Sequence, residues 1–445
     1  MKNNTNHFRV KKIKNVVDGV AREDKYIALV NDKTKLVTEH TNYADYVLYN
    51  KHQDLKIGST ADGALYAVCQ FLNDIFIDKK DLYRINSIAE ISCDTVTKWL
   101  TDYTHRFLKN GQHPLKQTVD AKRNAISLFL YGLCCDKSIN MKFLNESDLI
   151  TFAYVITPDG KRIMEPQYAI KIRYYEKEHV NRRIWRDMPL EIVERFIKLS
   201  QIYDPELTFA IVLMAYAGLR EGEICNVRRK ESCYGPGIIL SYGQPLLETN
   251  GNELTSSLPC EAISIDIKDT LLLRSDYKFV GPIKSPRIQP VYGLFLNVVF
   301  HYYQQHIKLI ANKPVEQYFP MFISRYRDRK TGQYLALTKR ALQARMIRLF
   351  YNHVLPSLEN DANPKFREFF QAMQNHTWGP HSFRHWYSVA LVLSGADEVT
   401  LQTFRGDKSP SSARVYLERK GELERIYRNA ASDLGRMIRD VEDNL

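Results

Sequence analysis

The chain has 445 residues, of which 44% are hydrophobic and 26% are charged, and this balance excludes an intrinsically disordered chain. Lysine and arginine number 63 against 51 aspartate and glutamate, and the net charge of +12 favours a polyanionic partner. No apolar run is long enough to span a membrane or to act as a signal peptide, so we expect a cytoplasmic protein that does not contact a membrane.

The length predicts two or three domains, and the first is a short N-terminal extension over residues 1–57. Residues 1–15 carry five cations and no acid, a pattern typical either of an arm that follows phosphates or of a frayed terminus. The β-branched and aromatic residues over 16–57 predict a short hairpin or an ordered arm.

Three helical patterns over 58–138 predict a small helical domain. Apolar residues recur there with a 3.6-residue period, as at Leu65, Val68, Leu72 and Ile75. The third helix begins among cations that are candidate DNA contacts, although a solvated helix face explains such residues equally well; they are Lys116, Lys122 and Arg123.

Residues 139–186 are expected to be an irregular, basic linker in which Arg182 and Arg183 follow a DNA backbone. The second domain spans 187–445 and starts with two helices, the later of which is apolar enough to be central to a core. A Gly-, Pro- and Ser-rich loop is expected over 229–260.

Three short strands, "AISIDI", "YKFVG" and "RIQPV", are expected beyond this loop, and the last two are expected to be joined at a turn by "PIKSP". Helices follow at 294–312 and after Thr338. The second of these carries further candidate DNA contacts, namely Lys339, Arg340 and Arg345.

Four sequence features in a fixed order carry the chemistry: "GLREGE" at 218–223, Lys284 after a strand, "HSFRH" at 381–385 and Tyr416 in "ARVY". Each has an ordinary structural explanation when taken alone. Together they resemble the tyrosine recombinase family, which includes phage integrases and the Cre-like, Xer-like and lambda-integrase-like enzymes. The resemblance covers about 185–430 by motif, and the helical segment before it by pattern and position.

The resemblance implies a mainly α fold with a small antiparallel β-sheet in the catalytic domain. A helical, SAM-like core-binding domain and an α+β catalytic domain would form a C-shaped clamp on DNA. It also implies that Tyr416 attacks a DNA phosphodiester and forms a 3′-phosphotyrosine linkage, while Arg220 and Arg384 hold the scissile phosphate. Guanidiniums suit this task because their paired donors match the phosphate oxygens.

The remaining roles are also carried over from the resemblance. His381 would donate a hydrogen bond or transfer a proton, Glu223 would support the site, and His385 would be structural. Lys284 would protonate the leaving 5′ oxygen, with Lys278 as a rival for that place. The energy of the broken bond is kept in the phosphotyrosine, so no metal, cofactor or ATP is expected. The seven cysteines show no ligand spacing either, and we expect reduced thiols.

One position departs from the family pattern. Gly406 is followed by Asp407, where the family usually has histidine or tryptophan, and a carboxylate there would repel a phosphate unless it is neutralised. Asp407 therefore supports an alternative function, a DNA-binding architectural relative that no longer cuts. A third hypothesis is a topoisomerase IB-like enzyme. The separate helical domain and the apolar C-terminal stripe count against it.

The C-terminal segment has apolar residues at helical spacing between Leu423 and Val441. In the family, such a helix docks into a neighbouring protomer, so the resemblance implies a tetramer on two DNA duplexes; packing on its own domain is the alternative. The expected partners are double-stranded DNA with a specific recombination site, further copies of the chain, and an accessory directionality factor. We therefore expect a nucleoid-associated integrase of a mobile genetic element.

Overall fold

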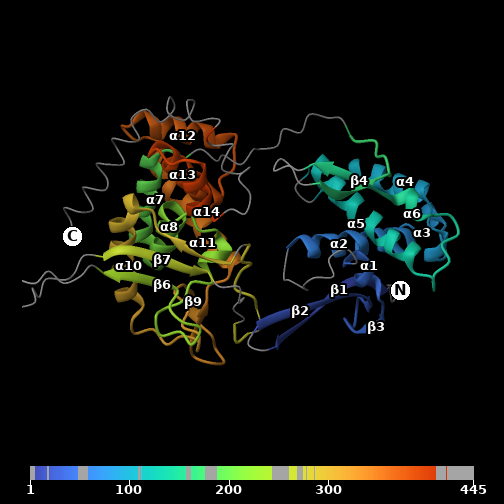
Figure 1. Ribbon diagram of the computed structural model, residues 1–445, viewed down its shortest axis with the longest axis horizontal. Helices are drawn as coiled ribbons and strands as arrows, with labels where there is room; N and C mark the ends of the chain where they lie inside the picture. Colours follow the sequence, from blue (N-terminus) through green and yellow to red (C-terminus); the bar gives the residue numbers. More distant parts are fainter. Residues whose placement is uncertain are drawn as a thin grey trace, which may run out of the picture. The chain divides into compact units, whose positions relative to one another are not determined.

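The computed structural model describes residues 6–17, 20–48, 59–108, 111, 113–156, 162–175, 188–242, 260–267, 274–276, 278–284, 286–406 and 417. The chain divides into two compact units, Met1–Asn181 and Arg182–Leu445, and Figure 1 shows the elements of each. Among the described residues, no helix is both long and apolar enough to cross a membrane.

The first unit combines a small antiparallel sheet, a set of helices and a separate β-hairpin. The sheet has the order β1-β2-β3, and β4 pairs with β5 in a separate two-stranded sheet. The elements are β1 (Asn6–Val17), β2 (Val20–Asn31), β3 (Val37–His40), α1 (Tyr43–Leu48), α2 (Ser59–Asn73), α3 (Lys80–Tyr83), α4 (Cys93–Thr104), α5 (Lys116–Cys135), α6 (Glu146–Leu149), β4 (Ile150–Ile156) and β5 (Arg162–Tyr168).

The core of this unit is built mainly by α2, α4 and α5, at the three places where the sequence period predicts helices. Trp99 of α4 is fully buried, and its indole N–H donates to Asp74 over 2.7 Å. Phe8 and Ile27 belong to the same core, so β1 and β2 pack on the helices. This corrects a prediction: β1 lies mostly within the cationic stretch that was expected to be an arm or a frayed terminus, and it pairs with β2 over twelve positions from Asn6↔Asn31 to Val17↔Val20.

The segment between Glu146 and Tyr168 corrects a prediction. We expected irregular chain throughout 139–186, but α6, β4 and β5 lie there. The stretch from Ile150 to Ile156 is rich in β-branched and aromatic residues, which favour a pleated strand. The strands were not predicted because the basic composition nearer residue 186 favoured a linker for the whole segment.

The second unit has a helical core and two small antiparallel sheets, with strand orders β6-β7-β8 and β10-β9. The elements are α7 (Leu190–Tyr203), α8 (Pro205–Tyr216), α9 (Glu221–Ile224), β6 (Ile238–Tyr242), β7 (Cys260–Ile267), β8 (Arg287–Pro290), α10 (Leu296–Ile310), β9 (Ile323–Arg327), β10 (Tyr334–Ala336), α11 (Lys339–Leu349), α12 (Pro364–Gln374), α13 (His381–Leu393) and α14 (Glu398–Arg405).

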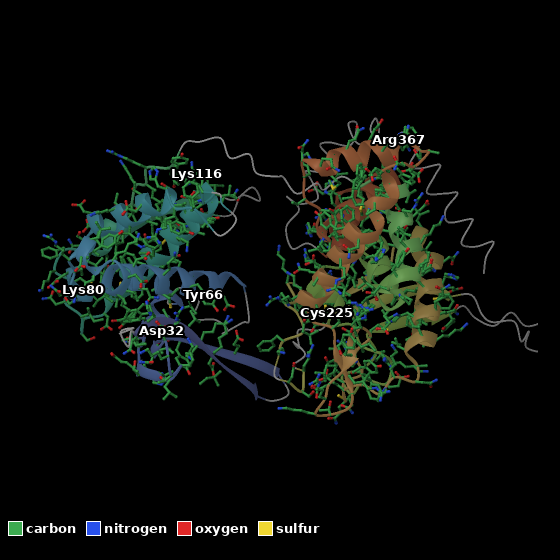
Figure 2. All side chains as sticks on the ribbon, turned by 180° about the vertical axis from the view of Figure 1, so that it is seen from behind. Asp32, Tyr66, Lys80, Lys116, Cys225 and Arg367 are labelled. Atoms are coloured by element: carbon green, nitrogen blue, oxygen red, sulfur yellow. The ribbon has the colours of Figure 1, made fainter. Side chains whose placement is uncertain are left out.

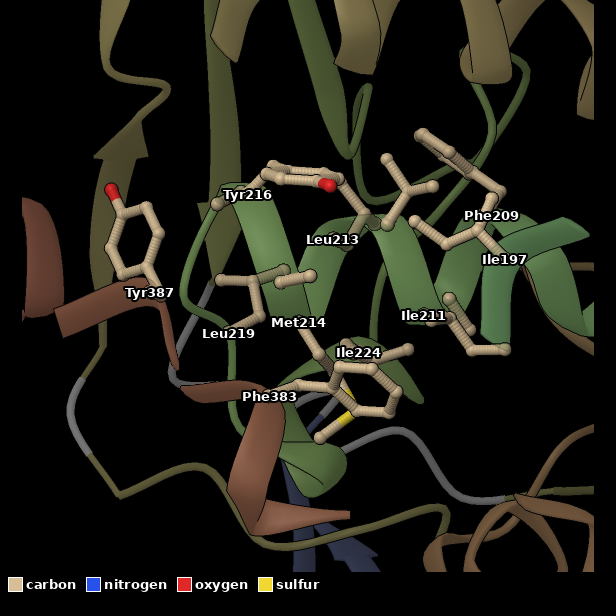
Figure 3. Close-up of a cluster of buried hydrophobic side chains, with 14 of the residues drawn as sticks. Ile197, Phe209, Ile211, Leu213, Met214, Tyr216, Leu219, Ile224, Phe383 and Tyr387 are labelled. Carbon is tan, nitrogen blue, oxygen red and sulfur yellow. The ribbon is translucent and has the colours of Figure 1, made fainter. Parts of the chain in front are cut away.

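Helix α8 is the centre of this unit, as its apolar composition predicts. Every residue from Leu207 to Tyr216 is buried, because α7, α10 and α13 all pack against this helix. Figure 3 shows Leu213, Met214 and Phe383 among the side chains that pack where α8, α9 and α13 meet. The core therefore fixes the two helix ends that carry the "GLREGE" and "HSFRH" motifs.

Two strand predictions in this unit are wrong. The expected loop contains β6, and "YKFVG" contributes only an isolated bridge residue to the described structure. Strand β8 pairs with β7 instead, in the register Ile265↔Gln289. The carbonyl of Val280 accepts a bond over 2.7 Å from the backbone N–H of Lys339, so Val280 contacts the first residue of α11.

The predicted fold class, mainly α with a small antiparallel β-sheet in the second unit, is confirmed. All seven cysteines are free. Cys233 is exposed, Cys69 and Cys225 are buried, and the other four lie between these extremes. Figure 2 labels Cys225, which is fully buried.

Candidate active site

The chain turns sharply between α8 and α9 to present Arg220. Gly218 has a φ of +65°, and a Cβ at this position would lie 2.3 Å from the ring of Tyr387. Only glycine fits both the left-handed backbone and the aromatic ring. Figure 3 shows the Tyr387 ring near the end of α8 that carries Tyr216. The turn thereby places Arg220 immediately before the first residue of α9.

Glu223 is a buried carboxylate that binds two arginines. It accepts from Arg220 Nη1 over 2.9 Å, and from Arg287 Nη1 and Nη2 over 2.9 and 3.1 Å. The backbone N–H of Arg220 also donates to Glu223 over 2.9 Å. Burial raises the pKa of Glu223, but the bonds and charge of Arg287 and the charge of Arg220 outweigh burial, so the pKa lies below its usual value.

Arg384 links the "HSFRH" helix to the Arg220 turn. Its side chain is 2% exposed, Nη1 donates to the carbonyl of Gly218, and Nη2 donates to the carbonyl of Arg405 over 2.8 Å. Arg384 therefore fixes the backbone two residues before Arg220 and also the last residue of α14. The geometry joins three segments that are far apart in sequence.

Arg405 is a second buried guanidinium beside Arg384. Its Nη1 donates to the hydroxyl of Ser388, and this hydroxyl donates to the carbonyl of Arg384 over 2.9 Å. Ser388 lies four residues after Arg384 on α13, so the hydroxyl bridges the two arginines through one helical turn. This contact ties α14 to α13.

Gly406 ends α14 against the side chain of Arg287. Its φ is +59°, and a Cβ there would lie 1.8 Å from Arg287 Nε. Gln289, on the same face of β8, accepts from Arg287 Nε over 2.7 Å and donates to the carbonyl of Phe404. Strand β8 therefore holds the end of α14. Asp407 and Tyr416, which follow in sequence, lie outside the described residues.

The segment that carries Lys284 is packed against α9. Gly222 and Gly281 are in backbone contact, because a Cβ on Gly281 would lie 2.8 Å from the Gly222 Cα. Asn226 donates to the carbonyls of both, over 2.7 and 2.9 Å. Lys284 is exposed three residues beyond Gly281.

The rival lysine, Lys278, is engaged elsewhere. Its Nζ lies 3.1 Å from the carboxylate of Asp276, which also binds Arg274 over 2.8 Å. Lys278 precedes Val280 in the chain, whereas Lys284 follows it. Which of the two lysines serves the site stays a prediction.

The two histidines of "HSFRH" lie at the start of α13. His381 is the first residue of the helix and is exposed, whereas His385 is half-buried. Positions 381, 384 and 385 share one helix face because they are three and four residues apart. His381 is thus the exposed residue one turn before the buried Arg384.

The candidate DNA-contacting cations differ in their surroundings. Lys116, labelled in Figure 2, and Arg340 are exposed. Lys122 instead donates to Gln70 over 2.7 Å and lies 4.7 Å from the centre of the Tyr103 ring. Burial, and then the charge of Arg106, lower the pKa of Lys122 to about 8.

The other cations in this group contact acids or lie outside the described structure. Arg123 lies 3.4 Å from Asp120, and Lys339 lies 3.6 Å from Glu221. Arg345 Nε donates to Asp204 over 2.9 Å, so this guanidinium joins α11 to the start of α8. The last two, Arg182 and Arg183, are not among the described residues. The role of the group in DNA binding stays a prediction.

Sequence reasoning missed Arg287, Gln289, Ser388 and Arg405. The available signal was the alternation of Arg287 and Gln289, which share one face of β8. A polar strand face usually points to solvent, but here it points to α9 and α14. Within the described residues, no group of three or more His, Cys, Asp and Glu side chains is arranged to hold a metal ion.

No protein-family model and no curated protein matches the chain. It is similar to a solved structure of the Tn1549 transposon integrase with circular intermediate DNA, at 14% identity and a TM-score of 0.47, over 86% of this chain and 99% of that one. It is also similar to the XerH site-specific recombinase bound to difH substrate (15% identity, TM-score 0.43, 82% and 79% covered).

A third similar structure is a lambda integrase dimer bound to a COC′ core site (11% identity, TM-score 0.43, 84% and 93% covered). These structures are integrases and site-specific recombinases.

Proposed function

We propose that the chain is a site-specific DNA recombinase, the integrase of a mobile genetic element, that cuts and rejoins strands through Tyr416. One observation carries the proposal. Arg220 and Arg384, 164 positions apart in sequence, act on the same short turn, because Arg384 donates to the carbonyl of Gly218. Arg220 follows this turn and Arg384 reaches it from α13, and two guanidiniums brought together in this way suit the nonbridging oxygens of a single phosphate.

The proposed reaction begins with attack by the phenolic oxygen of Tyr416 on the phosphorus. The new bond joins Tyr416 Oη to phosphorus, and the bond from phosphorus to the 5′ oxygen breaks. The phenol has a pKa of about 10, so it needs a proton acceptor and nearby positive charge to attack at neutral pH. We assign the proton transfer to His381, at the exposed start of α13.

The leaving 5′ oxygen needs a proton, and Lys284 is the proposed donor. Rejoining reverses the step: a 5′ hydroxyl gives its proton to Lys284 and attacks the phosphotyrosine, the bond from phosphorus to Tyr416 breaks, and the phenol regains its proton from His381. The two arginines hold the phosphate throughout, and Glu223 holds Arg220 in position. Removal of Arg220 or Arg384 should slow cleavage by about 10²–10³-fold, as loss of one oxyanion-stabilising group does.

A suicide substrate tests this function. DNA from the region beside the gene, nicked near the candidate crossover site, is incubated with the wild type, Tyr416→Phe and Tyr387→Phe. The covalent protein–DNA adduct should form with the wild type and with Tyr387→Phe, whose altered ring is buried beside the site, but not with Tyr416→Phe. An adduct that persists in Tyr416→Phe would exclude Tyr416 as the nucleophile.

A second candidate function is a DNA-binding architectural protein that no longer cuts. Asp407 favours it, since it follows Gly406, which packs against the Arg287 guanidinium, and a carboxylate there repels phosphate unless it is neutralised. Under this alternative no variant forms an adduct with the suicide substrate, yet DNA binding remains. Under the proposed function, a large gain in cleavage rate for Asp407→His would mean that the carboxylate slows the native enzyme.

We also propose that the apolar stripe between Leu423 and Val441 joins protomers into a tetramer on two duplexes. Truncation near residue 420 should abolish cooperative synapsis and leave a folded monomer that still binds DNA. Gel-shift assays with two labelled duplexes separate these steps, and unchanged synapsis would contradict the proposal.

A further inference from the structure

Strand β4 has an open edge and an apolar face. Phe152, Tyr154 and Ile156 alternate along it and share one face, to which Met164 of β5 adds. These four side chains are 45%, 60%, 74% and 57% exposed, respectively. Arg162 lies 4.0 Å from the centre of the Tyr154 ring and covers only part of it. The Tyr131 ring of α5 packs edge-on against Phe152, with ring centroids 6.1 Å apart, whereas Tyr154, Ile156 and Met164 stay more than half exposed. Two-stranded hairpins are marginally stable in water, so further packing on this exposed part of the face would stabilise the hairpin.

The hydrogen-bond pattern shows which backbone groups face away from β5. Ala169 N–H donates to the carbonyl of Leu149 over 3.0 Å, so position 149 forms a hydrogen-bonded pair. Such pairs alternate along an antiparallel ladder, and Thr151, Ala153 and Val155 therefore bond to β5. The N–H and C=O groups of Phe152, Tyr154 and Ile156 point outward.

The register of β5 agrees with this assignment. Pro166 lies opposite Phe152 and has no N–H, as a pair without hydrogen bonds permits. The same proline removes one donor from the outer edge of β5, which also carries the charge of Arg162. Within the described residues, no strand pairs with the outer edge of β4. The usable edge of the hairpin is therefore β4.

The sequence of β4 lacks the features that usually protect an edge. Its seven residues, "ITFAYVI", include no charge, no proline and no glycine. Natural edge strands generally carry lysine, proline or a bulge that prevents pairing with another chain. An uncharged, β-prone edge of this kind binds another strand readily.

We propose that β4 pairs with β4 of a second copy of this chain, antiparallel, about a two-fold axis at Tyr154. The strand is complementary to itself in this register, because Tyr154 meets Tyr154 while Phe152 meets Ile156 of the other copy. All three positions point their backbone groups outward, so each pair exchanges two hydrogen bonds. The apolar faces then join across a four-stranded sheet with the order β5-β4-β4-β5.

Pairing of two hairpins alone buries less than the roughly 1,200 Å² of a stable protein interface, so the contact is weak when it acts by itself. A covalent trap suits such a contact. In a hydrogen-bonded antiparallel pair the Cα atoms are about 5.5 Å apart, which lies within the range of about 4.4–6.8 Å that disulfides span. Tyr154→Cys should therefore form a disulfide between two copies under mild oxidation.

The matched control is Ala153→Cys, which is also exposed but points to the opposite face and lies opposite Val155 of the other copy. It should not link two copies. The register is tested by mixing Phe152→Cys protein with Ile156→Cys protein, since the mixture should link and each variant alone should link much less. The full-length wild type is oxidised in parallel, because it has an exposed cysteine at Cys233.

A second measurement does not depend on added thiols. Tyr154→Pro removes an outward N–H but no bond to β5, so the hairpin should remain while self-association in sedimentation velocity is lost, with or without DNA. The proposal is overturned if Tyr154→Cys links no better than Ala153→Cys, or if Tyr154→Pro associates like the wild type. Pairing of β4 with an unrelated protein or with DNA would give the first of these results.

Discussion

Replacement of Glu223 by glutamine should weaken the second unit far more than any other conservative change in the site. The carboxylate is fully buried and binds Arg220 and Arg287 through three side-chain bonds of 2.9–3.1 Å. Removing one partner from a buried ion pair costs about 3–5 kcal/mol, since the remaining charge loses its counterion. Glutamine keeps the shape but turns an amide group toward two cations.

For a domain of this size, the loss should lower the midpoint of thermal unfolding by roughly 10 °C. Trp378 and Trp386 are buried in the second unit and Trp99 in the first, so single-tryptophan variants report each unit separately. The matched control is Glu221→Gln. Glu221 accepts a bond from Gln343 and lies 3.6 Å from Lys339, which is partly exposed, and its loss should cost at most about 1 kcal/mol.

The pH dependence gives an independent check. The pKa of Glu223 is lower in the folded chain than in the unfolded chain, so its contribution to stability is complete above the unfolded value of about 4.3. This contribution is lost as the pH falls through the folded value. The gap in unfolding free energy between the wild type and Glu223→Gln should stay constant from pH 8 to 5 and narrow in more acidic solution.

Two results would refute this reasoning. The first is a Glu223→Gln variant no less stable than Glu221→Gln. The second is a gap that does not narrow at low pH. A double-mutant cycle with Arg287→Met isolates the pair itself, because residues in one ion-pair network do not contribute additively.

Three further predictions concern single side chains. Gly406→Ala should destabilise the second unit in chemical denaturation by at least about 1–2 kcal/mol, because the backbone of Gly406 is left-handed and a Cβ would clash with Arg287. Adding Arg287→Ala to this variant should relieve the clash but not the backbone strain. The free-energy losses of the two single variants should therefore not add up in the double variant, and additive losses would contradict this reasoning. Tyr387→Phe should leave stability equal or higher, since the described residues offer its buried hydroxyl no hydrogen bond; a loss above about 1 kcal/mol in the same assay would reveal one. The pKa of Lys122 is lower in the folded chain, so wild-type stability relative to Lys122→Met should rise from pH 8 to 10, as urea titrations of the Trp99 signal would show; a flat difference would exclude the shift.

Local patterns in the sequence predicted the elements whose cause is local. The periods of α2 and α4 appear directly as buried faces, and the continuous apolar run of α8 becomes the centre of the second unit. The loop-like composition around β6 misled the prediction, because its five strand residues are surrounded by Gly, Pro and Ser. In "YKFVG", the carbonyl of Val280 bonds to Lys339, and β8 pairs with β7.

The site shows the same limit. The specific order of motifs in the chain pointed to Arg220, Glu223 and Arg384 as candidates. Arg287 and Arg405 were not, because their roles depend on contacts with residues that are distant in sequence, namely Glu223 and Ser388. A polar residue on a short strand usually predicts solvent exposure. Arg287 instead faces the buried carboxylate of Glu223, and this contact depends on tertiary packing.

The distribution of thiols offers a practical route to watching this molecule at work. Cys233 is the exposed cysteine, whereas burial raises the pKa of the other six and keeps them largely protonated at neutral pH. A brief maleimide treatment should therefore attach one fluorophore to the second unit of the native sequence. Single-molecule experiments on DNA could then begin without a cysteine-free background.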